Sequence, residues 1–391
     1  MFGQSRDAGN EENKSSGTSL GKSKLMNPNE KPKIEGEPES KPEEESKKDE
    51  KFTSIVRVLG RKYEDISEEE RQKFFETMEK RFRNQEEFKK DLLKDFGSKE
   101  NIPDFIRVIF FEREKTPEEL EIINLVNQKT NELRRKFSLP NLNIPLENIY
   151  VVNNNDWPKE VSADSYYVPI GQFIVIREPK IKHLRSSKTI FAKNLIHEIV
   201  HFKSYNSLKK LEDFSDFNVY KTGLKNFTRS DSDKLLFGNL DEAVVEELTI
   251  KLLKSLRSHP LFEKEFERTE EAVKILSDET NTEGKPLLNG DEFYIGFDQE
   301  NDEIHSADFR RVQERNILNK LIEKIYTSDK NASKFKSREE VFDMFVEAVM
   351  TGRIVHLGKL IDKTFGKGTF RKIAETDSDI NKLEKYVDSL E

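Results

Sequence analysis

Two histidines and a glutamate have the types and spacing that metal-dependent hydrolysis requires. In the sequence HEIVH, His197 and His201 stand four residues apart and Glu198 follows the first of them directly. On a helix, residues four apart lie on one face, so both imidazoles can offer a nitrogen to a single metal ion. Glu198 would then lie beside that ion, where its carboxylate can take a proton from a water molecule.

The flanking sequence predicts that this segment is a helix, roughly residues 189–205, buried on most sides. Three titratable side chains on a buried helix need partners, and a metal ion would satisfy them. The alternative is that both histidines lie on a solvated helix face and bind nothing. The apolar residues around the motif are Ile190, Phe191, Leu195, Ile196, Ile199, Val200 and Phe202.

A catalytic zinc ion takes three protein ligands and leaves one position to water. The chain has no Cys, so the third ligand must be a His, Asp or Glu. The long metzincin motif is absent, since Ser204 and Ser207 stand where its Gly and His would be. Asp213 and Asp216 are reserve ligands.

The best third ligand is Glu242, which lies in the segment NLDEAVVEE at residues 239–247. On a helix, Glu242 and Glu246 share one face, so Glu242 could complete the metal site. Glu246 could accept the second ring proton of His197 and fix its tautomer. The alternative is structural, because Asn239 followed by Glu242 at the third helical position is also a capping box.

HEIVH followed by DEAVVE resembles the gluzincin metallopeptidases, most closely the minimal-gluzincin type and its uncharacterised bacterial relatives. The resemblance covers roughly residues 148–253. It implies a zincin-like fold, one zinc ion, peptide hydrolysis, Glu198 as general base and Glu242 as third ligand. Gluzincins also use a His or Tyr to donate to the developing oxyanion, for which the candidates here are Tyr220 and His305. Other readings of both residues, as ordinary surface side chains, stay open.

The positions of strand and helix signals predict a mixed fold. Residues 148–152 and 171–177 read as strands. The second of these precedes the metal-motif helix directly, so we expect its exposed edge to bind an extended peptide beside the metal. The region 278–308 reads as a long Gly- and acid-rich loop, either a lid or a flexible connection.

Helices are expected on both sides of these strands. Residues 67–96 predict one helix that begins at a Ser67–Glu70 capping box and ends at Gly97. Thr116 with Glu119 begins another, with Pro at its first helical position. The expected fold is therefore α+β: a zincin-like core, a small sheet plus the active-site helix, with extra helices on both sides. The expected segments are a disordered charged leader at 1–51, a helical segment at 52–140, the catalytic core at 141–256 and a helical half at 257–391.

Composition narrows the function classes. The net charge is -8 and Lys and Arg form no basic patch, so we expect no nucleic-acid partner. The amino terminus has no apolar run of a signal peptide, and no stretch is apolar enough to cross a bilayer. We expect a cytoplasmic protein that binds a peptide or protein substrate and no membrane.

The sequence thus predicts a zinc peptidase with His197, His201 and Glu242 as ligands and Glu198 as base. The main alternative is a catalytically silent metal-binding protein of the same fold that acts as a binding or regulatory module. Two others are an effector that acts on one protein partner through its helical half, and a helical scaffold in which the motif is accidental.

Overall fold

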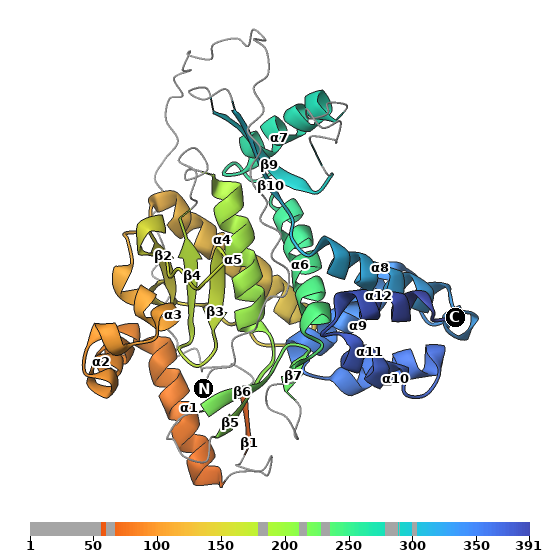
Figure 1. The fold of residues 1–391 in the computed structure, drawn as a ribbon, viewed down its shortest axis with the longest axis horizontal. Coiled ribbons are helices and arrows are strands. Elements are labelled where there is room, and N and C mark those ends of the chain that lie inside the picture. The colour runs from red at the N-terminus through yellow and green to blue at the C-terminus, as the bar shows by residue number, and fades with distance from the viewer. Residues whose placement is uncertain are drawn as a thin grey trace, which may run out of the picture.

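A computed structural model describes residues 56–59, 67–178, 187–210, 217–227, 235–277, 288, 290–298 and 303–391. It has small sheets among many helices, which is the mixed, mostly helical α+β class that the sequence predicts (Figure 1). The predicted leader at 1–51 and the reserve ligands Asp213 and Asp216 lie outside the described residues.

A three-stranded sheet forms the wall beside the motif helix. Its order is β2 (Ile149–Val152), β4 (Phe173–Arg177) and β3 (Ser165–Val168), with β2 parallel and β3 antiparallel to β4. The two predicted strands are therefore confirmed, but β3 was not predicted. Because β4 lies in the centre, its expected exposed edge does not exist, and β3 is the edge strand that faces the motif helix. The error arose because chain order does not give sheet order.

Two long helices pack beside this sheet. They are α4 (Pro117–Lys136), which begins at the predicted capping box of Thr116 and Glu119, and α5 (Lys188–Lys203), which carries the HEIVH motif. Ser187 caps α5, and Glu265 accepts hydrogen bonds from the backbone N–H groups of Lys188 (3.1 Å) and Thr189 (3.0 Å). A carboxylate at a helix N-terminus satisfies otherwise unpaired N–H groups, so these contacts fix where the motif helix begins.

The helix that carries Glu242 is α6 (Gly238–Ser255), and it packs along α5. The capping box suggested by Asn239 and Glu242 does not form, because Asn239 lies inside the helix and Phe237 is the capping residue, with φ of 59°. The buried carboxylate of Asp377 accepts hydrogen bonds from the N–H groups of Asn239 (2.9 Å) and Leu240 (3.0 Å) instead. Glu242 is therefore not engaged as a cap.

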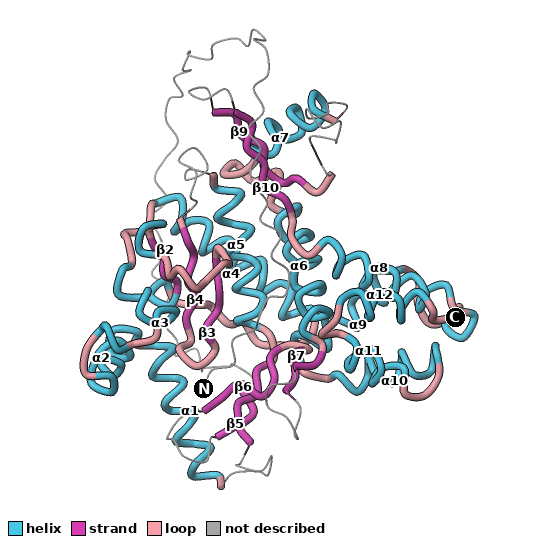
Figure 2. The backbone as a smooth tube through the Cα atoms, viewed as in Figure 1, coloured by secondary structure: helices cyan, strands magenta, loops and turns pink. Residues whose placement is uncertain are grey.

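A second sheet connects α5 to α6 at the lower end of both helices (Figure 2). Four of its five strands lie between α5 and α6 in the chain, so the sheet brings its own side chains to the metal-motif face; the fifth comes from residues 56–59. None of its strands was predicted. They are, in sheet order, β1 (Val56–Leu59), β5 (Asn206–Lys210), β6 (Phe217–Thr222), β7 (Lys225–Phe227) and β8 (Leu235–Leu236).

A helix and a hairpin project at the other end of α5 and α6 (Figure 1). The helix is α7 (Glu263–Leu276), and the antiparallel strands are β9 (Glu292–Asp298) and β10 (Glu303–Asp308). The prediction of a long loop over 278–308 was therefore wrong for residues 292–298 and 303–308, which pair as strands. The hairpin leads into residues 309–311, which approach the motif face.

The predicted single helix over residues 67–96 is two helices, α1 (Glu68–Arg83) and α2 (Gln85–Phe96). The helical conformation is interrupted at Asn84, whose φ is -146°. The side chain of Asn84 accepts a hydrogen bond from the N–H of Glu87. An Asn that caps a new helix ends the preceding one. The side chain of Glu70 is outside the described part, so its capping box stays a prediction.

The C-terminal part is a helical body, as predicted, and shares its core with the rest of the protein. One hydrophobic cluster includes residues of α4, α5, α6 and the C-terminal helices, such as Ile123, Ile196, Val244 and Leu383. The predicted boundaries at 140 and 256 stay predictions. Among the described residues, no helix combines the length and apolar character needed to span a membrane. The remaining helices are α3 (Asp104–Arg107), α8 (Val312–Thr327), α9 (Arg338–Thr351), α10 (Ile354–Phe365), α11 (Thr369–Thr376) and α12 (Ile380–Asp388).

The cap of α6 predicts a pH-dependent stability. Burial raises the pKa of Asp377 to about 6, although its bonds from the backbone of Asn239 oppose this shift. The folded state then holds the proton more tightly than the unfolded chain does. The contribution of Asp377 to stability is therefore complete below about pH 4 and is lost as the pH rises through about 6. This loss is about 2 to 3 kcal/mol.

Urea denaturation measures the free energy of unfolding of the wild type and of Asp377→Asn. We expect the difference, wild type minus variant, to fall by about 2 to 3 kcal/mol between pH 4 and pH 7. Asp379→Asn is the matched control, since Asp379 is an exposed cap whose pKa is lowered by its bond to Lys382. Equal differences at both pH values for Asp377→Asn would contradict the prediction.

Candidate metal centre

The two histidines of α5 and Glu242 of α6 come together. His197 Nε2 lies 3.4 Å from one oxygen of Glu242, and His201 Nε2 lies 3.5 Å from the other. Ligand atoms at zinc–ligand distances of about 2.0–2.1 Å in a tetrahedron lie about 3.3 to 3.4 Å apart. Among the described residues this is the only group of three such side chains that could hold a metal ion. The donor set is one that zinc binds in proteins, and one donor atom from each of the three residues lies within 4.8 Å of the others.

The outward ring nitrogen of each histidine faces another carboxylate of α6. His197 Nδ1 lies 2.8 Å from Glu246 Oε2, which is the contact expected from the sequence. His201 Nδ1 lies 3.8 Å from Oδ2 of Asp241, a residue to which we assigned no role. A carboxylate at Nδ1 favours the tautomer that leaves Nε2 without a proton, and Nε2 is the nitrogen that faces Glu242.

The carboxylate of Glu246 has three partners. It is completely buried, and besides His197 it binds the ammonium group of Lys193 (3.1 Å) and the backbone N–H of Arg310 (3.0 Å). Burial alone would raise its pKa, but the bonds to His197 and Lys193 outweigh burial and lower the pKa to about 2. Glu246 therefore stays ionised at any physiological pH and holds the His197 ring in one orientation.

The same contacts change the titration of His197. Burial alone would lower its pKa, but the carboxylates of Glu242 and Glu246 outweigh burial and raise the pKa to about 9. In the metal-free protein the ring is thus an imidazolium at neutral pH. Metal binding must remove this proton, because only the neutral ring can be a ligand.

The proposed general base has a partner on the edge strand. Glu198 is buried and its Oε1 accepts a hydrogen bond of 2.8 Å from the hydroxyl group of Ser165, at the start of β3. This bond ties the carboxylate to the strand that would lie along a substrate. Ser165 was not predicted because no sequence pattern indicated strand β3.

The three side chains of His197, His201 and Glu242, here called the metal-ligand cluster, lie in a cleft of about 870 Å³. One side is formed by β3 and the residues next to it, and the other by α6 and the segment that leads into α8. Four of its lining residues are cationic and bring positive charge to the carboxylates on its floor. These four are Lys193, Lys225, Arg310 and Arg311.

Two of these cations flank the Glu242 carboxylate. Lys225 of β7 makes a short ion pair with Oε1, and Arg311 Nε lies 4.0 Å from Oε2. Burial would raise the pKa of Glu242, but Lys225 and the histidines outweigh it and hold that pKa well below its usual range. The carboxylate is therefore ionised, as a metal ligand must be.

The two expected oxyanion donors do not line this cleft. Tyr220 lies in β6, opposite a register shift in its pairing with β5, and His305 lies in β10, paired with Gly296. His259 and His356 are also absent from the lining. Lys193 could have been found from the sequence, since it precedes His197 by one helical turn, but Lys225, Arg310 and Arg311 depend on long-range folding.

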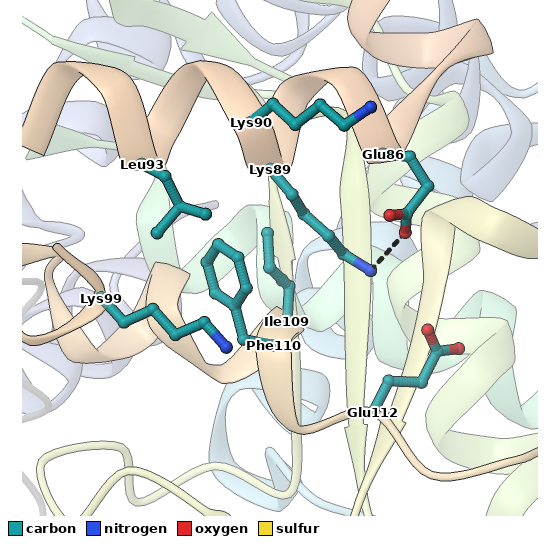
Figure 3. Close-up of a pocket in the computed structure, with 8 residues that line it drawn as sticks. All are labelled: Glu86, Lys89, Lys90, Leu93, Lys99, Ile109, Phe110 and Glu112. Atoms are coloured by element: carbon teal, nitrogen blue, oxygen red, sulfur yellow. Dashed lines mark hydrogen bonds and ion pairs between the residues drawn. The ribbon is translucent and has the colours of Figure 1, made fainter. Parts of the chain in front are cut away.

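A separate pocket of about 380 Å³ lies between α2 and the segment before α4 (Figure 3). Lys89 pairs with Glu86 at 2.8 Å, and Glu112 pairs with Lys115. Among the described residues no group of metal-ligating side chains lies in this pocket, so it adds no candidate for chemistry.

A comparison with protein-family models, curated proteins and solved structures gives no match. The metal centre must therefore be judged on its own geometry.

The raised pKa of His197 predicts that zinc binding releases a proton. At pH 7 we expect the metal-free protein to lose about one proton from His197 per zinc ion, and this release to disappear as the pH rises through about 9. Calorimetric titration with zinc in two buffers of different ionisation enthalpy measures the proton count. Glu246→Gln removes a carboxylate that raises the pKa, so this variant should release fewer protons at pH 7. A wild-type count near zero at pH 7 would be inconsistent with the prediction.

Proposed function

We propose that this protein is a zinc-dependent peptidase that hydrolyses peptide bonds. The observation that supports this function best is the grouping of three donor atoms, from His197, His201 and Glu242, within 4.8 Å of one another. Glu198 is on the same helix and at the same cleft, as a hydrolase of this kind requires. We also propose a zincin-like arrangement for the core, in keeping with the resemblance to gluzincins.

When bound, the zinc ion would act as a Lewis acid that lowers the pKa of a water molecule to about 7. Glu198 then takes a proton from the attacking water and passes it to the leaving amine nitrogen as the C–N bond breaks. The hydroxyl of Ser165 keeps the Glu198 carboxylate directed into the cleft between these two transfers. Glu246 keeps the imidazole of His197 turned toward Glu242, while Asp241 lies 3.8 Å from Nδ1 of His201 without a hydrogen bond to it.

The substrate would lie along β3. This strand is an edge strand whose one side pairs with β4, and its residues line the cleft. An extended peptide can add to such an edge through backbone hydrogen bonds, which bind many sequences alike. A peptide or protein substrate therefore fits the cleft better than a small metabolite does.

The main alternative remains a metal-binding module without turnover. A structural metal site needs ligands and their partners but no further carboxylate in the cleft, whereas Glu198 is buried there at a stability cost. An accidental motif on a helical scaffold is disfavoured because donors 41 to 45 residues apart in sequence converge with zinc-like spacing. An effector with a single protein target would share the chemistry and differ only in substrate range.

We expect the purified protein to hold about one zinc ion per chain. His201→Ala removes one of three ligands and should release the metal under dialysis, which elemental analysis measures. Replacement of His356, a helical histidine outside the cleft, by Ala is the matched control and should leave the zinc content unchanged. Equal zinc content in the wild type and His201→Ala would exclude this ligand set.

Glu198→Gln keeps the shape of the side chain but removes the base. We expect this variant to bind zinc as the wild type does and to lose peptide cleavage on the order of 1000-fold. Cleavage of a denatured protein mixture, followed by mass spectrometry, measures the loss without knowledge of the substrate. Full cleavage by Glu198→Gln would refute the mechanism, and zinc binding without wild-type cleavage would favour the binding module.

A further inference from the structure

Two consecutive arginines form a turn at the wall of the cleft. Arg310 and Arg311 connect β10 to α8, and both side chains line the cleft. Arg311 has φ of 61°, a left-handed conformation that a residue with a Cβ adopts at an energetic cost. Such a conformation persists only where surrounding contacts impose it, and it is common at ligand-binding sites.

The contacts that impose this turn also hold the metal-ligand cluster. The N–H of Arg310 donates to Glu246 Oε1 (3.0 Å), the carboxylate that orients His197. The carbonyl oxygen of Arg310 accepts a hydrogen bond of 3.0 Å from Nε of Arg315, a buried residue of α8. The backbone of the arginine turn is therefore fixed relative to the metal ligands at both its N–H and its carbonyl group.

A carboxylate of the protein already lies on this turn. The guanidinium of Arg310 pairs with Asp164, which immediately precedes Ser165, the partner of Glu198. The side chains of Arg310 and Asp164 are 54% and 41% exposed. Ion pairs this exposed contribute little to stability, so another carboxylate that enters the cleft can replace Asp164 without a large penalty.

We propose that the Arg310–Arg311 turn is a carboxylate-binding subsite for the substrate, with Asp164 in the place of the substrate's carboxylate when the cleft is free. Arg310 makes the principal contact, because the guanidinium group can bind a carboxylate through two parallel hydrogen bonds. Arg311 adds positive charge, although it also pairs with Glu314 (3.3 Å) and approaches Glu242. The ligand class is a peptide with a carboxylate close to the scissile bond, either its C-terminal group or an acidic side chain. This inference rests on the proposed peptidase function for its role but not for its binding test.

Binding is tested with zinc-loaded Glu198→Gln protein, so that no turnover interferes. The probes are two libraries of proteome-derived peptides, one with free carboxyl groups and one in which every carboxyl group is amidated. We expect equilibrium dialysis to enrich peptides of the first library over the second, and Arg310→Met to reduce this enrichment on the order of tenfold. Asp164→Asn should increase it, since the internal competitor is removed. A purely structural role of the ion pair predicts loss in both variants.

The same experiment includes control variants and distinguishes the two possible sources of the carboxylate, the peptide C-terminus and acidic side chains. Arg310→Lys should restore part of the enrichment, and Arg371→Met, which breaks an exposed arginine–glutamate pair on α11 outside the cleft, should leave it unchanged. A third library with amidated side chains and free C-termini distinguishes the terminal carboxylate from acidic side chains. Equal retention of free and amidated peptides, including no retention of either, would overturn the subsite.

Wild-type enzyme then separates this inference from the proposed function. Cleavage of the free library with a preference that Arg310→Met abolishes would support both. Cleavage that does not depend on carboxylates would overturn the subsite but not the peptidase. Carboxylate-dependent binding without any cleavage would refute the peptidase and leave the subsite in place.

Discussion

The buried carboxylate of Glu246 is the constraint on which the candidate metal centre depends. A fully buried negative charge is tolerated only with charged or hydrogen-bonding partners, because its desolvation is costly. Those partners are His197 and Lys193 of α5 and the backbone of Arg310 before α8. One side chain of α6 thereby fixes the motif helix α5 and the arginine turn. Loss of any partner would leave part of this charge unpaired, so the three segments are held in one arrangement.

The position of α6 is in turn set by its N-terminus. Its first N–H groups bond to Asp377, more than 130 residues later in the chain, and Asp241 Oδ1 accepts a 2.7 Å hydrogen bond from the backbone of Leu224. Because Asp241 and Glu242 are neighbours and Glu246 lies one turn further on, this anchoring sets the height of all three carboxylates along α5. The C-terminal helical body and the five-stranded sheet thus determine the position of Glu242 and Glu246, because both bond to the first turn of α6.

The sequence predicted the parts of the site that follow from helical period alone. His197 and His201, and Glu242 and Glu246, are each four residues apart on one helix, and a single assumption of facing helices brings all four together. It did not predict β3, Ser165, Lys225 or the arginine turn, since each depends on contacts between segments far apart in the chain. Sheet order gave the clearest failure: β4 precedes the motif helix in sequence, yet β3 lies beside it in space. The prediction of one continuous helix through Asn84 failed for a local reason. An Asn in a helical pattern is compatible with either an interior position or a cap.

The surroundings of Glu198 differ from those of Glu246 in the partners that offset the burial of each carboxylate. A carboxylate that is 5% exposed contributes to folding only if its hydrogen bonds repay its desolvation, and the bond from Ser165 is a single neutral donor. Glu246, by contrast, is paired with a lysine, a histidine and a backbone N–H group. The protein therefore strongly stabilises the Glu246 carboxylate, which positions His197. It only weakly stabilises the Glu198 carboxylate, which faces the cleft. The position of this carboxylate beside the donor cluster is in keeping with the proposed role of Glu198 as a general base.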